Sequence, residues 1–313
     1  MKMDLQTESF LNDFNSFDLP PMEVLPIDFV RQNVEAQIPT SDVEVKEIHS
    51  ITIPGQQREI PLRIYIPNGD GPFPVLVTFH GGGWIFGSLD VHDPFCRDIS
   101  SQASMIVVSV DYCLAPEHKF PAPLEDCYLA LTWTAANIHK YRGDTSKLVL
   151  CGDSAGGNLA AALTLMTRDR HGPNISFQVL IYPVVQHRFN TPSYEKFAQK
   201  YFLTKSSMEW FWSLYLPSDS DGNNPYASPL FAKDFAKLPP ALIILAEFDP
   251  LHDEGKLYAQ KLEQAGVPIM IKSYPSIHPF VAFAHQLSIG KTAIGDIAKT
   301  LHEFFHEQKP AKK

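Results

Sequence analysis

Apolar residues along the chain gather in short runs that alternate with longer, helix-like segments. Six of the runs are strand-like and cover residues 74–79, 105–111, 147–151, 177–182, 241–247 and 267–273. Strands that alternate with helices in this way usually form a parallel sheet. Upstream, residues 43–53 and 59–66 form two more runs, and the turn at Pro54-Gly55 between them predicts an antiparallel pair. The pattern therefore predicts an α/β fold with a mostly parallel sheet and helices on both faces.

The stretch 187–216 interrupts this alternation and is dense in aromatic side chains. Such an insertion fits a cap helix that covers an apolar pocket. Trp210, Phe211 and Leu214 could equally pack the helix onto the body of the protein, and we expect both roles on different faces. Residues 1–40 contain two further helix-like pieces.

Residues 152–157 read Gly-Asp-Ser-Ala-Gly-Gly and lie between a strand-like run and a helix-like run, 158–166. A Gly-x-Ser-x-Gly in that context is the nucleophile elbow of α/β-hydrolases. The sharp turn strains the serine backbone and requires small neighbours. It exposes the Ser154 hydroxyl above the carboxyl edge of the sheet, with a helix N-terminus behind it that favours negative charge. Ser154 is the predicted nucleophile.

A second motif, His-Gly-Gly-Gly-Trp at 80–84, follows the strand at 74–79. Acyl transfer creates an oxyanion that needs preorganised N–H donors, and a glycine run lets the backbone approach the substrate. We expect the N–H groups of Gly82, Gly83 and Ala155 to form this oxyanion hole. A plain glycine-rich loop is the alternative, but two such motifs at two strand ends favour a hydrolase.

Together these segments resemble the bacterial type of the hormone-sensitive-lipase-like branch of the α/β-hydrolases. Other matching segments are Asp-Tyr-Cys-Leu-Ala-Pro-Glu-His at 111–118, Phe-Pro-Ala-Pro-Leu-Glu-Asp at 120–126, Asp-Pro-Leu-His-Asp-Glu at 249–254 and Ile-His-Pro-Phe at 277–280. The resemblance covers about residues 40 to 310 and implies an α/β-hydrolase fold with a helical cap. It divides the chain into N-terminal cap helices (1–45), a first part of the core (46–186), a cap insertion (187–225) and a second part of the core (226–313). Members of this family often form homodimers.

In this fold the acid and the base follow the nucleophile along the chain, in that order. Asp249 comes directly after a strand, whereas Asp253 and Glu254 suit the first turn of the next helix. The resemblance also assigns the acid to Asp249. Among the later histidines, His278 lies in a loop after a strand, where α/β-hydrolases carry the base. We therefore predict a triad of Ser154, Asp249 and His278, and expect most other histidines at the surface or in local hydrogen bonds.

Two further motifs match metal and phosphate sites only in part. His302-Glu-Phe-Phe-His306 fits the His-Glu-x-x-His of zinc proteases, but the usual third ligand is missing downstream. An amphipathic C-terminal helix with outward-facing histidines explains the pattern better. Gly290-Lys-Thr292 resembles the end of a phosphate-binding loop, but His285 stands where the first glycine should be. We expect no metal and no cofactor.

The amino-acid composition indicates which classes of partner and which cellular compartment to expect. The net charge is −9 and basic residues are not clustered, which argues against nucleic acid and anionic membranes as partners. No apolar run is long enough to cross a membrane, and no apolar signal segment follows the N-terminus. The four cysteines, Cys96, Cys113, Cys127 and Cys151, lack metal-ligand spacing and favour reduced thiols in the cytoplasm.

These features predict a serine carboxylesterase that acts on small-molecule esters through an acyl-enzyme. His80 and Asp153 are expected to brace the oxyanion loop and the elbow. An amidase or deacetylase with the same triad is an alternative, because pocket shape decides the leaving group. A non-catalytic small-molecule receptor is another, since the resemblance includes plant hormone receptors that lost the base, but this chain retains His278.

The short cap and its bulky aromatic residues predict a preference for short to medium acyl chains, about C2 to C8. Candidate pocket walls are Trp84, Phe202, Met208 and Phe211. Two positions depart from the family pattern: Cys113 replaces an arginine, and Pro279 replaces the glycine after the base. Pro279 predicts that a helix begins there, because proline suits the first helical position.

Overall fold

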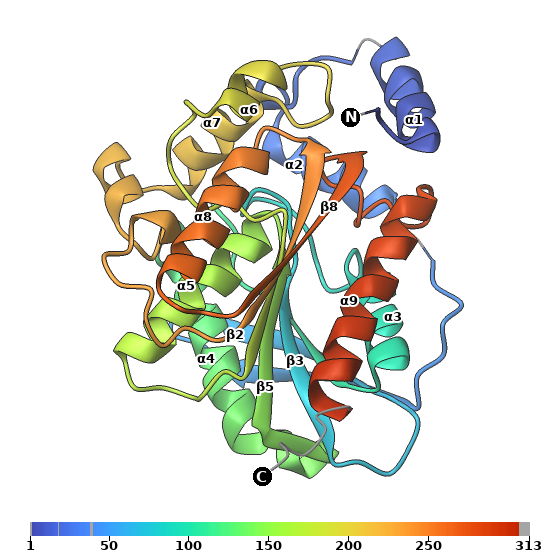
Figure 1. Cartoon of the computed structure of the whole chain (residues 1–313), viewed down its shortest axis with the longest axis vertical. Coiled ribbons are helices and arrows are strands. Elements are labelled where there is room, and N and C mark those ends of the chain that lie inside the picture. Colours follow the sequence, from blue (N-terminus) through green and yellow to red (C-terminus); the bar gives the residue numbers. More distant parts are fainter. Residues whose placement is uncertain (1, 18, 38–39, 307–313) are drawn as a thin grey trace.

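The computed structural model describes residues 2–17, 19–37 and 40–306 (Figure 1). Its centre is one sheet of eight strands in the order β1-β2-β4-β3-β5-β6-β7-β8. The strands are β1 (Glu47–Pro54), β2 (Glu59–Ile66), β3 (Phe73–Phe79), β4 (Ile106–Val110), β5 (Gly143–Asp153), β6 (Phe177–Ile181), β7 (Ala241–Phe248) and β8 (Ile269–Ile277). β1 and β2 pair in antiparallel fashion, whereas β3 to β8 run parallel. The mostly parallel sheet and the antiparallel pair expected from the sequence are confirmed.

Helices cover both faces of the sheet (Figure 1). One face carries α3 (Asp93–Ala103) and α9 (Ser288–His306), and the other carries α4 (Ala122–Asn137), α5 (Ala155–Asp169) and α8 (His252–Gln264). Short 3-10 helices η2 (Ile138–Tyr141) and η4 (Pro229–Phe231) lie in the connections. Along β3, Val75 and Val77 join the apolar cluster under α4 and α5, while Leu76 joins the cluster under α3 and α9. Burial on both faces explains why this strand is apolar throughout.

The N-terminal segment and the insertion lie together at the end of the sheet towards which β8 points (Figure 1). The first contains α1 (Leu5–Ser16), η1 (Met22–Val24) and α2 (Ile27–Ala36), and the second contains α6 (Pro192–Lys196), α7 (Lys205–Tyr215) and η3 (Asp219–Asn223). Phe14 and Phe202 bring their ring centroids within 4.8 Å, and Ser207 donates a hydrogen bond to Glu23 (3.2 Å). The aromatic stretch of the insertion thus forms two helices and an irregular segment between them, not one continuous helix.

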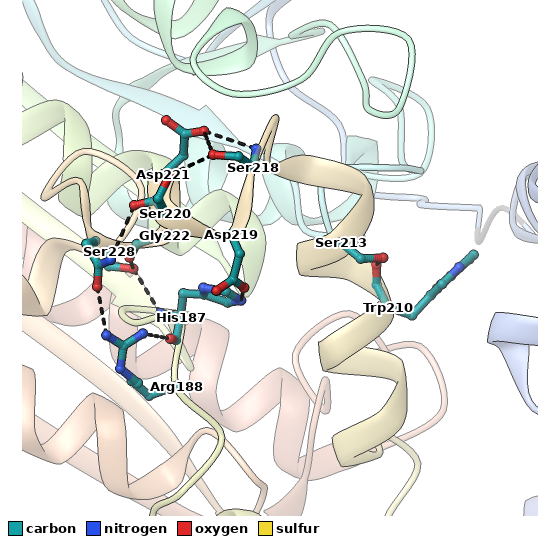
Figure 2. Close-up of polar contacts among 11 residues, drawn as sticks. His187, Arg188, Trp210, Ser213, Ser218, Asp219, Ser220, Asp221, Gly222 and Ser228 are labelled. Carbon is teal, nitrogen blue, oxygen red and sulfur yellow. Dashed lines mark hydrogen bonds and ion pairs between the residues drawn. The ribbon is translucent and has the colours of Figure 1, made fainter.

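His187, at the start of the insertion, holds η3 against the core (Figure 2). Its backbone N–H donates to Ser228 Oγ (2.8 Å), and the Ser228 hydroxyl donates to Gly222 O (2.6 Å). The His187 ring lies 5.0 Å from the ring of Trp212 on α7, and its Nε2 is 3.7 Å from the Asp219 carboxylate. A Cβ atom on Gly222 would stand 2.1 Å from His187 Nδ1. The contact is therefore so close that only glycine fits there.

Residues 278–286 form successive turns, and α9 begins only at Ser288. The expectation that a helix starts at Pro279 is wrong. Ala282 N–H donates to Pro279 O (2.9 Å), and Gln286 N–H donates to Phe283 O (2.8 Å), so the segment is closed by turns of four residues. Phe283 packs against Phe10 of α1, with ring centroids 5.1 Å apart. This tertiary packing, which the local sequence does not encode, holds the segment in turns.

Candidate active site

Ser154 is the single residue between the end of β5 and the start of α5. Its backbone has φ 54° and ψ −117°, a conformation that side-chain-bearing residues rarely adopt. The surroundings leave no space for larger neighbours: a Cβ on Gly152 would stand 2.2 Å from Gly156 O, and one on Gly156 would stand 2.0 Å from Phe79 O. The strained turn that the motif predicts is present.

The side chains of Ser154, His278 and Asp249 form one hydrogen-bonded series. His278 Nε2 lies 2.9 Å from Ser154 Oγ, and His278 Nδ1 lies 2.8 Å from Asp249 Oδ2. The other oxygen of Asp249 accepts the N–H of Leu251 (2.9 Å). The exposed fractions are 8% for Ser154, 4% for His278 and 0% for Asp249, so the series is almost dry.

The topology explains why residues so distant in the chain meet. The three residues follow β5, β7 and β8, whose carboxyl ends share one edge of the parallel sheet. Tyr182 follows β6, between the nucleophile and the acid, and its ring packs edge-on against His278 with centroids 4.6 Å apart. The sequence motifs did not identify Tyr182. The sequence feature that could have indicated it is its position directly after a buried strand, at the sheet edge where the triad residues also lie.

The glycines after β3 adopt backbone conformations that other residues avoid. Gly82 has φ +115° and Gly83 has φ +56°, and Gly82 O accepts hydrogen bonds from the N–H groups of Ile85 (3.0 Å) and Phe86 (3.1 Å). Across residues 2–17, 19–37 and 40–306, the N–H groups of Gly82, Gly83 and Ala155 have no hydrogen-bond acceptor. They are therefore available to an acceptor on a ligand.

Asp153 and His80 both contact Gly81, at the start of the loop that we expect to form the oxyanion hole (residues 81–86, the oxyanion loop). Gly81 N–H donates to Asp153 Oδ1 (2.8 Å), and Gly81 O accepts from His80 Nδ1 (2.8 Å). Tyr112 stacks on the His80 ring at 4.4 Å and donates its hydroxyl to His80 O (2.7 Å). Burial raises the pKa of Asp153 to about 6 and lowers the pKa of His80 to about 4. His80 is thus neutral at neutral pH, with its proton on Nδ1.

His92 was not identified from the sequence, although it is the next side chain behind Asp153. Its Nε2 is 3.6 Å from Asp153 Oδ1, and its ring stacks on Phe95 with centroids 4.9 Å apart. Burial lowers the pKa of His92 to about 3, so the ring is neutral at neutral pH. The contact joins residues 61 positions apart through tertiary structure alone, so no local pattern could have indicated it.

Helix α1 braces the segment that carries His278. Asp4 N–H donates to Pro275 O (2.8 Å), and the Thr7 hydroxyl is 2.9 Å from that of Ser276. At the other end of the segment, the Gln6 side chain donates to Gln286 O (2.7 Å) and accepts from the N–H of Ser288 (2.9 Å). One helix therefore fixes this base segment (residues 275–288) on both sides of the imidazole.

The expected pocket walls occupy different environments. Phe211 lies directly over the oxyanion loop, because a Cβ on Gly83 would stand 2.4 Å from its ring, and Met208 is buried one turn earlier in α7. Phe202 packs among Phe10, Phe14 and Phe283.

Trp84, the fourth expected pocket wall, packs against α7. It is fully buried and stacks on Tyr215 with ring centroids 4.3 Å apart and planes 3° apart. Its bulk and its backbone φ of 62° fix the oxyanion loop against α7, in packing that the motif alone does not reveal.

Within the part of the chain that the structure describes, no cluster of three or more His, Cys, Asp or Glu side chains could hold a metal ion. The rings of His302 and His306 lie 4.6 Å apart on α9. All four cysteines are buried free thiols. None of the described helices combines the length and the apolar composition needed to cross a bilayer.

Comparison with known proteins also indicates an α/β-hydrolase. A family model for the alpha/beta hydrolase fold matches residues 76–282. The carboxylic ester hydrolase LipN of Mycobacterium tuberculosis is 41% identical over 246 residues, which cover 75% of this chain and just under two thirds (64%) of that protein. The arylesterase of Saccharolobus solfataricus is 33% identical over 285 residues, covering 90% of this chain and 93% of that protein.

Solved structures agree over nearly the whole chain. A hyperthermophilic esterase from Pyrobaculum calidifontis superimposes with a TM-score of 0.91 at 39% identity, covering 97% of this chain and 99% of that one. An ester hydrolase from the metagenome of Lake Arreo, solved with a bipyridine phosphonate derivative, gives 0.93 at 35% identity, with coverage of 97% and 99%. With its elbow, its glycine loop and these matches, the chain belongs to the hormone-sensitive-lipase-like branch of the α/β-hydrolases.

Proposed function

We propose that this chain is a serine carboxylesterase that hydrolyses small-molecule esters through an acyl-enzyme intermediate. The observation that carries the proposal is the hydrogen-bonded series from Asp249 through His278 to Ser154, at 2.8 and 2.9 Å. Relatives named carboxylic ester hydrolase and arylesterase support esters as the substrate class.

The geometry supports the following sequence of steps. Because Asp249 accepts at Nδ1, that nitrogen carries the proton and Nε2 presents its lone pair to the Ser154 hydroxyl. Ser154 Oγ attacks the ester carbonyl while His278 Nε2 takes its proton, and the N–H groups of Gly82, Gly83 and Ala155 hold the oxyanion. His278 then protonates the leaving alcohol. Water attacks the acyl-enzyme by the same route, and Asp249 remains ionised throughout.

We assign the cap to residues 1–45 and 187–225 and the core to 46–186 and 226–313. The contacts of Phe202 with Phe14 and of Ser207 with Glu23 support a cap that the two segments build together. Phe211 over Gly83, with Met208 buried beside it on the same helix, supports a small acyl site and a preference for chains of about C2 to C8.

We infer a cytoplasmic protein that forms homodimers. Four free cysteines fit a reducing compartment. β8 is an edge strand that exposes 42% of Met270 and 43% of Ile271, and an apolar edge of this kind favours pairing with a second copy.

One pair of substrates separates the esterase from its alternatives. The purified chain should hydrolyse p-nitrophenyl butyrate and be at least about a hundredfold slower on the matching butyranilide, because the aniline is the poorer leaving group. Equal or faster cleavage of the anilide would indicate an amidase. Binding of the ester without turnover would indicate a receptor.

A further inference from the structure

Arg31, on α2, reaches the oxyanion loop. Its Nε donates to Ile85 O (2.7 Å), and its Nη2 donates to Ala115 O (2.9 Å). The same guanidinium binds both oxygens of the Glu117 carboxylate, at 2.7 and 2.8 Å. One side chain therefore joins an N-terminal helix to two loops of the core.

Besides their bonds to Arg31, the oxyanion loop and the loop that carries Ala115 are hydrogen-bonded to each other. Ala115 N–H donates to Trp84 O (2.9 Å), and Ile85 N–H donates to Gly82 O (3.0 Å). Gly82 and Gly83 contribute no side chains that could fix their own positions, and glycine backbone is intrinsically mobile. The orientation of their N–H groups consequently depends on the hydrogen bonds at Trp84, Ile85 and the carbonyl groups behind them.

Helix α2 has little apolar contact with the rest of the protein. Of its residues Ile27–Ala36, Val30 alone is buried, and Phe29 is half exposed. Arg31 is thus the strongest polar attachment of this helix to the core. The guanidinium also holds the pKa of Glu117 at about 2, so the pair remains ionised throughout the neutral pH range.

We propose that Arg31 is a positioning residue through which docked α2 holds the oxyanion loop in its productive geometry. Docking of this cap helix and completion of the oxyanion hole are then a single event, as lid closure often is in enzymes. The proposal rests on the esterase function proposed above.

The kinetic test is Arg31→Gln, assayed with p-nitrophenyl butyrate. An oxyanion hole acts on the transition state, and loss of one donor lowers kcat by about 10²–10³. A loosened loop should lower kcat by about 10- to 100-fold and leave KM within about threefold. The lysine in Arg31→Lys can reach only some of the acceptors of Arg31, so the kcat of this variant should lie between those of the wild-type protein and Arg31→Gln. A rise in KM with unchanged kcat would overturn the proposal, because Arg31 would then only close α2 over the substrate.

Arg170→Gln is the matched control. Arg170 binds both oxygens of Glu125 at 2.8 and 2.6 Å, so it makes the same type of ion pair without any contact to the oxyanion loop. This variant should retain wild-type kcat and KM, whereas an equal loss in both variants would show a general effect of ion-pair removal and overturn the proposal.

Hydrogen–deuterium exchange provides a measurement that does not depend on activity. The amides of Ile85 and Phe86, which donate to Gly82 O, should exchange faster in Arg31→Gln than in wild type, and at the wild-type rate in Arg170→Gln. Unchanged exchange in Arg31→Gln overturns the proposal. If the wild-type protein hydrolyses no ester, the proposed function fails, yet the exchange result still decides whether Arg31 holds the loop. Should Arg31→Gln not fold, Arg31→Lys is put through the same two measurements.

Discussion

Ser154 is held in a strained conformation with its hydroxyl 2.9 Å from His278 Nε2. Such strain persists only where the surrounding structure imposes it, here through the absence of side chains at Gly152 and Gly156. The Ser154 hydroxyl is therefore the proposed nucleophile, and the close packing at Gly152 and Gly156 stabilises the strained turn.

Ser154→Ala should remain folded and lose turnover by about 10⁴-fold or more, the usual scale for a triad nucleophile. His278→Ala should lose a comparable amount. His302→Ala and His306→Ala are matched controls on α9 and should keep wild-type rates, with and without a metal chelator. Turnover of p-nitrophenyl butyrate and thermal unfolding are measured on each variant. If Ser154→Ala retained a tenth of the activity, another group would be the nucleophile.

Asp153 should make stability depend on pH. Burial raises its pKa from 3.8 to about 6, so between about pH 4 and 6 the folded state holds a proton that the unfolded chain has lost. The free energy of unfolding therefore falls as pH rises through this window, by at most about 3 kcal/mol. Asp153→Asn removes that fall. Urea unfolding at about pH 4.5 and 7.5 compares the two proteins, and an identical pH response in both would contradict the assignment.

Residues with motifs could be predicted, and residues without them could not. Ser154, Asp249 and His278 each stand directly after a strand in a recognisable context, and the structure brings them together. Arg31 contacts Ile85, 54 positions away, and His92 contacts Asp153, 61 positions away. Tertiary packing alone brings such distant residues together. Trp84 belongs to a motif, but its burial against Tyr215 depends on the position of α7.

Among the elements, η3 illustrates how one close approach can hold a segment (Figure 2). Its Gly222 lies against the His187 ring, and the bridging hydroxyl of Ser228 ties the two backbones together. The insertion is thereby attached where it leaves the core and again where it returns.

Gly222→Ala should lower the free energy of unfolding by about 1–3 kcal/mol, because the added Cβ overpacks against His187. The loss should shrink when the same change is made in a His187→Ala background, where the obstructing ring is gone. Gly295→Ala on α9 is the control, since its Cβ would meet nothing closer than 3.8 Å, and helix propensity should make it stabilising by up to about 1 kcal/mol. Equal effects of Gly222→Ala in both backgrounds would contradict the contact.

The sheet could be predicted from sequence because its inner strands, such as β3, β4 and β6, are buried on both faces and read as mostly apolar runs. The cap could not be predicted in the same detail. Between α6 and α7, Lys200 and Phe202 adopt positive φ values of 67° and 70°, and Asn15 of α1 donates to Lys200 O (3.1 Å). Contacts with a distant helix break the aromatic stretch into two, although its composition suits one helix.

For the whole molecule, the side chains of Ser154, Asp249 and His278 are buried, so we expect the proposed cap to move when substrate enters. The buried Met208 and Phe211 lie in the segment that we assign to the cap, so we expect the acyl chain to fit beside them. Rates for p-nitrophenyl esters should be highest at about C2 to C8 and fall steeply by about C16. Faster hydrolysis of emulsified long-chain triglyceride than of a butyrate ester would contradict this.

Self-association belongs to the same scale. If the apolar edge at β8 pairs with a second copy, light scattering should give twice the chain mass, and Ile271→Lys should shift the population to monomer because a charge would be buried. Leu257→Lys changes a similarly exposed apolar residue on α8 and should leave the dimer intact. A wild-type monomer at micromolar concentration would rule out this interface.

The brace of α1 on the base segment has a consequence for how the chain folds. The contact of Thr7 with Ser276 spans 269 positions, and that of Gln6 with Gln286 spans 280. Contacts of such high sequence separation must close a long loop before they form, so we expect them to form late. The core sheet can therefore assemble while the imidazole is still unfixed, and catalytic competence should appear as the last kinetic phase of refolding. On heating, we expect the reverse order, so that the base segment is among the first parts of the molecule to unfold.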